Sequence, residues 1–233
     1  MTYAGLFKTW ATVLIAILVA ILLSVAAFTT GAGAQEQPPC SDSDRVVLDP
    51  GHGGTDSGAV NKNGLQEKVQ TLKVATSLKK LLEYDGCTVY MTRMEDETLS
   101  NTQRANTANS FKTKYPGDYV LVSIHMNGST NTSADYTTTL FGKWRKDKEL
   151  ANTIFGSLST LPAAGGTGKI AARTPYSFAS GVLLKSNMPA TIAETVFITN
   201  DTEGRLLSDG TCTRQQQIAE ALKVGIEGYL TTP

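Results

Sequence analysis

Apolar residues recur every three or four positions in several stretches of the chain, and this spacing is typical of amphipathic helices. One stretch covers residues 65–82 and is followed by a stop signal at Asp85-Gly86. Two others cover residues 150–161 and 218–229, and residues 100–111 show a related pattern. We therefore predict a helix in each of these four stretches.

Short runs of apolar and β-branched residues have the length of strands. They cover residues 45–48, 87–92, 119–124, 138–141, 182–184 and 190–198. The predicted helices separate most of these runs, and such alternation is typical of an α/β layer structure. A chain of 233 residues with ordinary apolar content can bury one sizeable core. The pattern predicts a single α/β domain with a central, mostly parallel sheet flanked by helices on both faces.

The first part of the chain differs from the rest. Lys8 is the only charged residue before position 35, residues 10–28 are nearly all apolar, and Ala32-Gly33-Ala34 offers small residues for cleavage. This order is typical of a secretory signal peptide. The apolar run also approaches the length that spans a bilayer, so a retained membrane anchor is the alternative. We expect residues 1–34 to be the leader, residues 35–43 a linker and residues 44–231 the folded domain.

The three cysteines, Cys40, Cys87 and Cys212, all lie after the predicted leader. An oxidising compartment outside the cytoplasm would permit one disulfide and leave one thiol over. Cys40 and Cys87 both fall near the starts of predicted neighbouring strands, so we expect these two to pair.

Charge excludes some partners. The chain carries 21 basic and 21 acidic residues, and its formal net charge is zero. Nothing in this balance indicates a polybasic face for nucleic acid or anionic lipid. We expect no nucleic-acid partner, and no membrane contact once the leader is removed.

The chain contains only two histidines, and each directly follows a strand-like run. His52 comes after residues 46–51, and His125 comes after residues 120–124. Active sites of open parallel α/β sheets form outside the carboxyl ends of the strands. His52 and His125 can therefore converge although they are far apart in the sequence.

Two carboxylates complete a candidate site. Glu67 falls in the first turn of the predicted helix over residues 65–82, and Glu194 interrupts the apolar run 190–198. Two imidazoles and a carboxylate suit zinc with an open fourth position, and a second carboxylate can act as general base. Taken singly, each residue has a structural alternative: a strand-end histidine, a helix N-terminal charge or a buried ion pair. No local zinc motif such as HExxH is present.

Several short motifs follow one another along the chain. They are Leu48-Asp49-Pro50-Gly51-His52-Gly53-Gly54, Gly64-Leu65-Gln66-Glu67-Lys68, Met91-Thr92-Arg93, Ser123-Ile124-His125-Met126-Asn127 and Pro189-Ala190-Thr191-Ile192-Ala193-Glu194. In this order they resemble the motifs of the zinc N-acetylmuramoyl-L-alanine amidases of the Amidase_3 family. The resemblance covers residues 44–230.

This resemblance implies a sheet of about six strands and one zinc ion held by His52, Glu67 and His125. It also implies that Glu194 is the catalytic carboxylate. The expected substrate is peptidoglycan, cut at the amide between N-acetylmuramic acid and the L-alanine of the stem peptide. An exported hydrolase of this kind would act in the periplasm, the cell wall or the extracellular space.

Other polar residues near these motifs are secondary candidates. We expect Asn127 to help position the substrate. Arg93 and Arg104 are candidate contacts for a substrate carboxylate, with structural ion pairs as the alternative. Asp49 or a backbone carbonyl would accept a hydrogen bond from the second ring nitrogen of a ligand histidine.

The chain departs from the family pattern in two places. Residues 136–141 lack the usual Gly-x-Glu, and Ala193 replaces the usual larger aliphatic residue before the catalytic glutamate. Only 68 residues separate His125 from Glu194, so we predict a site without an inserted capping helix. The alternative functions are a wall-binding domain without turnover and a zinc peptidase that cuts within stem peptides.

Overall fold

The computed structural model describes residues 39–142 and 144–232. The predicted leader and residues 35–38 of the predicted linker lie outside the described residues. Within those described ranges, none of the helices has the length and hydropathy needed to cross a bilayer.

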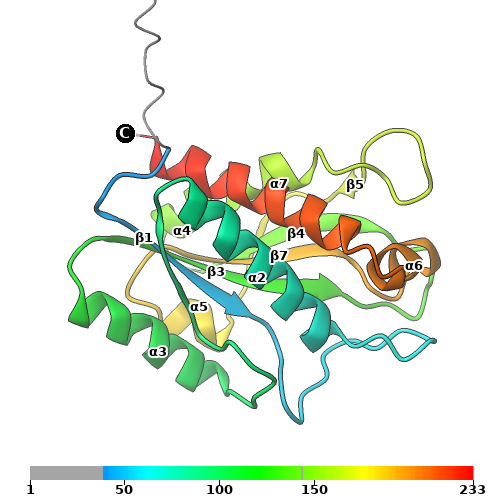
Figure 1. The fold of residues 1–233 in the computed structure, drawn as a ribbon, viewed down its shortest axis with the longest axis horizontal. Coiled ribbons are helices and arrows are strands. Elements are labelled where there is room, and N and C mark those ends of the chain that lie inside the picture. The colour runs from blue at the N-terminus through cyan, green and yellow to red at the C-terminus, as the bar shows by residue number, and fades with distance from the viewer. Residues whose placement is uncertain (1–38, 143, 233) are drawn as a thin grey trace, which may run out of the picture. The chain divides into compact units, whose positions relative to one another are not determined.

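The centre of the domain is a mixed sheet (Figure 1). Its strands are β1 (Asp44–Pro50), β2 (Thr88–Met91), β3 (Asp118–Asn127), β4 (Tyr136–Phe141), β5 (Ala171–Ala172), β6 (Tyr176–Ser177) and β7 (Ala190–Phe197). The order is β2-β1-β3-β7-β4-β5, and β6 also pairs with β4. The first four strands in this order are parallel, whereas β4 runs antiparallel to β7. The prediction of a mostly parallel sheet is confirmed.

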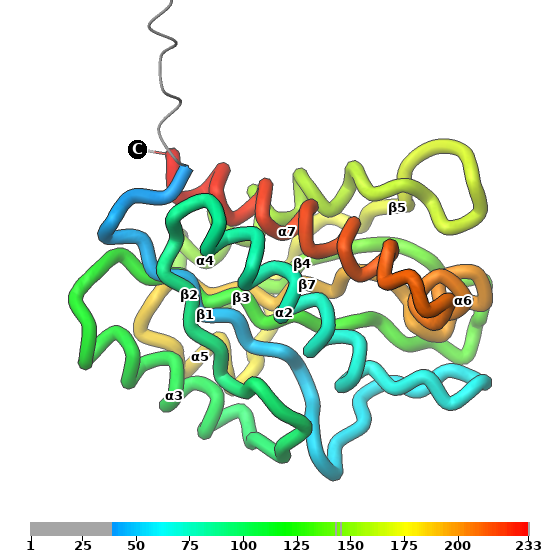
Figure 2. Tube along the Cα trace, in the orientation of Figure 1, coloured from blue at the N-terminus to red at the C-terminus, as the bar shows by residue number. Residues whose placement is uncertain are grey.

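Helices cover both faces of the sheet, as the sequence predicts (Figures 1 and 2). One face carries α2 (Glu67–Tyr84), α4 (Arg145–Leu158) and α7 (Thr213–Leu230). The other face carries α3 (Asn101–Lys114) and α5 (Gly181–Lys185). A further helix, α6 (Asp201–Ser208), directly follows β7 and packs against α7.

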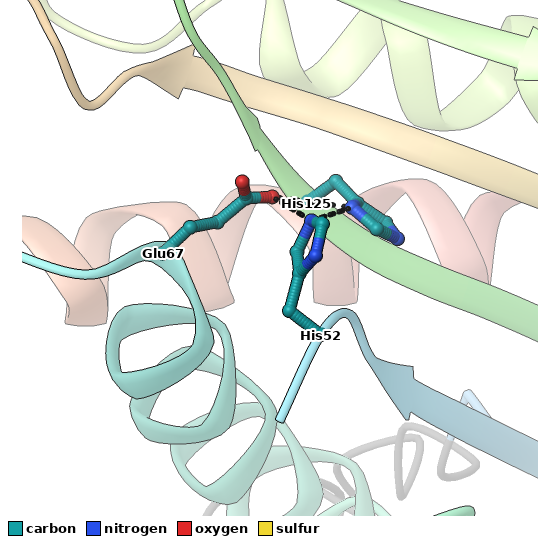
Figure 3. A group of neighbouring side chains, drawn as sticks. All are labelled: His52, Glu67 and His125. Carbon is teal, nitrogen blue, oxygen red and sulfur yellow. Dashed lines mark hydrogen bonds and ion pairs between the residues drawn. The ribbon is translucent and has the colours of Figure 1, made fainter. Parts of the chain in front are cut away.

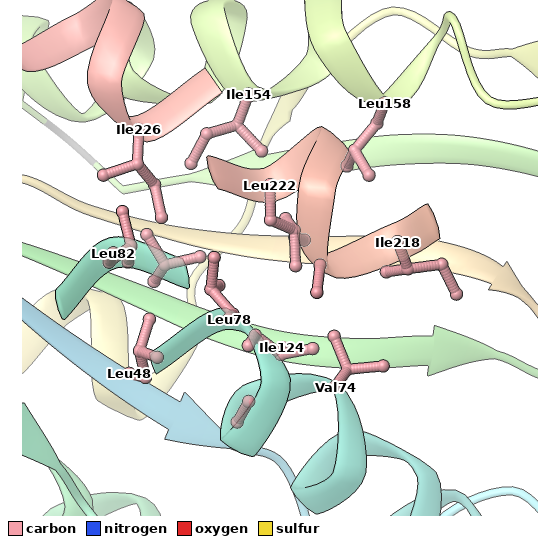
Figure 4. Close-up of a cluster of buried hydrophobic side chains, with 14 of the residues drawn as sticks. Leu48, Val74, Leu78, Leu82, Ile124, Ile154, Leu158, Ile218, Leu222 and Ile226 are labelled. Atoms are coloured by element: carbon pink, nitrogen blue, oxygen red, sulfur yellow. The ribbon is translucent and has the colours of Figure 1, made fainter. Parts of the chain in front are cut away.

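Alternation along the strands produces two separate cores. In β1, Val46 and Leu48 lie in the core beneath α2, α4 and α7, whereas Val47 lies in the core beneath α3 and α5. Successive strand residues point to opposite faces, so one buried strand supplies both cores. Figure 4 shows Leu78, Leu222 and neighbouring side chains filling the larger core. The two cores fix the sheet and hence the edge at which its strands end.

Two helices that the spacing of apolar residues indicates weakly or not at all, α3 and α6, begin with hydrogen-bonded N-caps. Helix α3 begins with a capping box, in which the Ser100 hydroxyl accepts a hydrogen bond from the Gln103 backbone and the Gln103 side chain accepts one from the Ser100 backbone. The side chain of Asn200 caps α6, which the sequence analysis did not predict.

One predicted strand is wrong. Residues 182–184 lie in the short helix α5, which Ser180 caps and which buries Val182 and Leu183. Periodicity cannot separate a strand from a helix in so short an apolar run, because both place apolar residues in a row.

The predicted disulfide is confirmed. Cys40 and Cys87 are bonded, with Cα atoms 5.0 Å apart, and both residues are buried. They precede β1 and β2, which are neighbouring parallel strands. Cys212 is exposed and free.

Candidate metal centre and active site

The turn after β1 brings His52 close to His125. A side chain at Gly51 would place its Cβ 2.4 Å from Cε1 of His125, so only glycine lets the backbone approach this ring. His52 itself has a φ of 59°, a left-handed conformation that few residues other than glycine adopt. The turn is therefore shaped to direct the His52 side chain toward β3.

Three side chains from three elements converge at this edge of the sheet (Figure 3). Oε1 of Glu67 lies 3.1 Å from Nε2 of His52 and 3.1 Å from Nδ1 of His125. The two ring nitrogens are 3.2 Å apart. One ligand atom from each residue lies within 4.8 Å of the others, so the cluster can hold a metal ion.

Neighbouring groups orient the cluster. Nδ1 of His52 lies 2.9 Å from Oδ2 of Asp56, which leaves Nε2 facing Glu67. The backbone N–H groups of Met126 and Ala59 donate to the two carboxylate oxygens of Glu67. A carboxylate on the second ring nitrogen is the usual way to fix a ligand histidine. Asp56, not Asp49, has this place in the structure.

The charges within the cluster are strongly coupled. Burial alone would raise the pKa of Glu67, but hydrogen bonds from His125 and His52 and their charges lower it below its ordinary value. Burial would lower the pKa of both histidines, but the Glu67 carboxylate raises each above its ordinary value. Glu67 is 3% exposed, so little water screens this negative charge. The cluster thus favours a bound cation.

Glu194 lies on β7 directly opposite His125. Residues opposite each other on paired strands project from the same face, so the Glu194 side chain lies beside the histidine. Within residues 39–142 and 144–232 its carboxylate has no hydrogen bond. Burial raises the pKa of Glu194, and the negative charge of Glu67 adds to this against the opposing effect of His125. Such a carboxylate is suited to accept a proton.

Comparison with known proteins agrees with this geometry. The family model Amidase_3, described as N-acetylmuramoyl-L-alanine amidase, matches residues 46–228. The chain belongs to this family.

Individual relatives cover most of the chain. N-acetylmuramoyl-L-alanine amidase AmiC of Escherichia coli O6:H1 is 32% identical over 83% of this chain and 55% of its own length. The probable cell wall amidase LytH of Staphylococcus saprophyticus is 34% identical over 80% of this chain and 58% of its own length. The chain therefore spans a little over half the length of these two relatives.

Solved structures share the fold. N-acetylmuramoyl-L-alanine amidase from Clostridium difficile 630 matches with a TM-score of 0.72 and 31% identity, over 82% of this chain and 99% of that one. Amidase AmiC2 of Nostoc punctiforme matches with a TM-score of 0.71 and 28% identity, over 83% and 100% of the two chains.

In this Amidase_3 domain, a buried polar network supports the turn that carries His52. Asp49 is fully buried and accepts hydrogen bonds from Thr92, Ser123 and Arg104. Burial alone would raise the pKa of Asp49, but the Arg104 charge and these hydrogen bonds lower it. Nη1 and Nη2 of Arg104 also donate to the carbonyl oxygens of Pro50 and His52, over 2.8 and 2.6 Å.

Arg93 belongs to the same support. Its guanidinium donates to the backbone carbonyls of Pro50, Gly51, Lys68 and Glu95, and the residue is 2% exposed. The expected contact of Arg93 with the substrate stays a prediction. Arg93 and Arg104 both hold the turn after β1.

Asn127 lies at the end of β3, next to an irregularity in the pairing with β7. Its side-chain Nδ2 is buried and has no hydrogen-bond partner in the part of the chain that the structure describes. A buried donor without a partner is costly, so it is expected where a ligand completes the site. The role of Asn127 in substrate binding stays a prediction.

The helices between β4 and β7 leave the histidines partly open. Helix α4 packs against α7, and α5 packs against α3. Among the described residues, neither helix donates or accepts a hydrogen bond at the cluster. Each histidine side chain is 22% exposed.

Sequence reasoning missed two residues of the site. Asp56 stands four residues after His52 in a glycine-rich segment, and this spacing is the signal that could have identified it. Gly58 has a φ of 65°, and a Cβ there would lie 2.6 Å from Oε2 of Glu67 and 2.6 Å from Cδ2 of His52. Gly58 matters because Glu67 and His52 pack closely against it. A glycine in a sequence does not by itself indicate such packing, so the sequence analysis could not identify it.

Proposed function

We propose that this protein hydrolyses the amide between N-acetylmuramic acid and the L-alanine of the peptidoglycan stem peptide. The observation that carries the proposal is the cluster of His52, Glu67 and His125, with Glu194 opposite His125 in register, in a chain of the Amidase_3 family. Its relatives are named as amidases of this type or as cell wall amidases.

The donor set fits zinc. Two imidazole nitrogens and one carboxylate oxygen are a known ligand set of catalytic zinc, which keeps a position open for water or substrate. Nδ1 of His52 is engaged by Asp56, as expected for a ligand histidine. One zinc ion held by His52, Glu67 and His125 would polarise the scissile carbonyl and acidify a water molecule.

The side chains around the proposed zinc position transfer protons, orient the ligands and bind the substrate. Glu194 accepts a proton from the attacking water and returns it to the amine of the departing L-alanine, for which its raised pKa and unbonded carboxylate suit it. Asp56 holds the His52 ring, and the Asp49 network holds the turn. Asn127 donates to the substrate through Nδ2, so Asn127→Ala should raise KM about tenfold, the worth of one hydrogen bond to a strongly polarised group.

We also propose that the protein is exported. The apolar leader pattern in residues 1–34 supports a secretory signal, and the disulfide between Cys40 and Cys87 suits an oxidising compartment. Peptidoglycan lies in that compartment.

Digestion of purified peptidoglycan tests the proposal. Zinc-loaded wild type should release stem peptides with a free L-alanine amine, as mass analysis of the fragments would show. A chelator and Glu194→Gln should each abolish release, and added zinc should restore only the chelated wild type. Glu220→Gln is a matched control, because Glu220 is exposed on α7.

Other products would identify other functions. Fragments that leave L-alanine attached to muramic acid would show a peptidase. Binding to the wall without any released fragment would show a wall-binding domain without turnover.

A further inference from the structure

The face that carries Glu194 continues across the sheet beyond the metal cluster. His125, Glu194 and Thr138 are level with one another on β3, β7 and β4. Residues paired in register project from the same face, so these side chains form one row. Lower on this face, Leu121, Ile192 and Leu140 are buried with α3 and α5. The row of His125, Glu194 and Thr138 lies outside that core, nearer the carboxyl ends of β3 and β7.

The row is extended by the segment that contains β5 and β6. Ala171 pairs with Tyr136, and Tyr176 pairs with Leu140, so the segment runs alongside β4. The backbone N–H of Arg173 donates to the Thr137 carbonyl over 2.9 Å. This bond places Arg173 next to the row, one strand further from the metal cluster than β4.

The Arg173 side chain is held over an aromatic ring. Its guanidinium carbon lies 3.9 Å from the centre of the Tyr136 ring, and Tyr136 in turn packs on Phe197 with ring centres 4.6 Å apart. A planar guanidinium stacks well on an aromatic face and keeps its edge donors free. The stack orients the cation without using its N–H groups.

Arg173 has no anionic partner among the described residues. It is exposed, and its guanidinium makes no hydrogen bond or ion pair there. Strand β4 carries no acidic residue, and the carboxylate of the adjacent Asp135 is half-buried and interacts with the charge of Arg214. The buried Arg214, by contrast, is paired with Glu203. Arg173 is therefore an oriented cation whose donors are available to a ligand.

Tyr176 lies on the same side of the site. It is 51% exposed. Partial burial raises the pKa of Tyr176, and the charge of Glu194 raises it further. Tyr176 pairs with Leu140, two residues along β4 from Thr138, so Tyr136, Arg173 and Tyr176 all lie on β4 or on the segment paired with it, next to the strand that carries Glu194.

We propose that Arg173 binds a carboxylate of the stem peptide while the scissile amide lies at Glu194, and that it makes the enzyme prefer stems with free rather than amidated carboxyl groups. The proposal rests on the proposed amidase function. Two strand spacings of about 4.8 Å separate Glu194 from Arg173, and an extended residue spans about 3.4 Å. The carboxylate therefore belongs to the second or third residue of the stem.

Two soluble substrates test this preference. They are N-acetylmuramoyl tripeptides of the same sequence, one with free carboxyl groups and one with carboxamides in their place. Wild type should cleave the free acid with a kcat/KM about tenfold higher, mainly through KM, because charge-assisted hydrogen bonds are lost with the amide. Arg173→Gln should remove this ratio by lowering only the rate on the acid, and Arg173→Lys should retain part of it.

Lys80→Gln is the control for a lost surface charge. Lys80 is exposed on α2, thirteen residues and about 20 Å along the helix from Glu67. It should leave the ratio unchanged. A wild type without preference, or an Arg173→Gln variant that keeps the wild-type ratio, would overturn the proposal.

Binding of the released tripeptides separates this proposal from the proposed function. Calorimetric titration of zinc-loaded protein should show about tenfold tighter binding of the free acid than of the amide, and Arg173→Gln should abolish the difference. If neither substrate is cleaved but this difference is present, the amidase function fails and only the binding of a stem-peptide carboxylate by Arg173 stands. If cleavage occurs without a difference in either experiment, only the role of Arg173 fails.

Discussion

The two ends of the parallel strands are held in different ways. At their amino ends, the Cys40–Cys87 disulfide joins the segment before β1 to the start of β2. At their carboxyl ends, Arg93 and Arg104 hold the turn after β1 through hydrogen bonds to backbone carbonyls. One end is held by a covalent bond between buried residues, the other by a buried polar network.

The two ends of the strands therefore have different roles: the disulfide end contributes to stability, and the end with the cluster carries the proposed chemistry. Metal ligands and a general base need unsatisfied polar atoms, and these are costly in a buried position. The network of Asp49, Arg93 and Arg104 fixes the turn that carries His52, so that the side chains of the cluster are held in place without a covalent cross-link. We expect variants at the metal end to change activity most, and variants at the disulfide end to change mainly stability.

The largest expected effect is that of a lost ligand. His125→Ala removes one of the three proposed ligand atoms, so the proposed amidase activity should fall by about 10⁴-fold or more, which corresponds to about 5.5 kcal/mol of barrier. The purified variant should lack stoichiometric zinc by elemental analysis. Its metal-free form should still unfold cooperatively, near the midpoint of metal-free wild type. Full zinc content with normal turnover would contradict the assignment of this ligand.

The next effect concerns the network under the turn. Asp49→Asn leaves Arg104 buried without its negative partner, so the free energy of unfolding should fall by about 3–5 kcal/mol. Urea titration of the metal-free protein measures this change. Asp118→Asn, at an exposed position, should change it by less than about 0.5 kcal/mol. Equal effects of the two substitutions would remove the network from its supporting role.

The disulfide end should show a somewhat smaller effect on stability and little effect on activity. Replacing Cys40 and Cys87 together by serine opens a covalent loop with a sequence separation of 47. The expected loss is about 3 kcal/mol of unfolding free energy, with kcat/KM retained when the variant is assayed below its melting temperature. A large loss of kcat/KM in the folded variant would show that the two ends are coupled.

Lowering the pH should reduce the contribution of the Asp49 network to the free energy of unfolding. Because the folded pKa of Asp49 is lowered, its contribution to stability is present above the ordinary aspartate pKa and is lost as the pH falls below it. One such proton contributes a slope of at most about 1.4 kcal/mol per pH unit. Melting temperatures of metal-free wild type and Asp49→Asn between about pH 5 and pH 2 should therefore converge. Parallel curves would exclude Asp49 as the titrating group.

Much of the fold was determined by local pattern. Helical spacing predicted α2, α4 and α7, and strand-like runs predicted β1, β3 and β7. The meeting of His52, Glu67 and His125 was also predictable, because parallel strands end at one edge and the helix after β1 begins there. These features follow from residue spacing along the chain, which the sequence contains directly.

Other features were decided only by the tertiary structure. Residues 182–184 form a helix rather than a strand because Ser180 caps them and α3 covers them. Arg93 holds the turn after β1, and Asp56 rather than Asp49 orients His52. Each depends on contacts between segments distant in the sequence or on the left-handed backbone at His52. The sequence determined which residues reach the site edge, and packing decided which of their polar atoms are left free for chemistry.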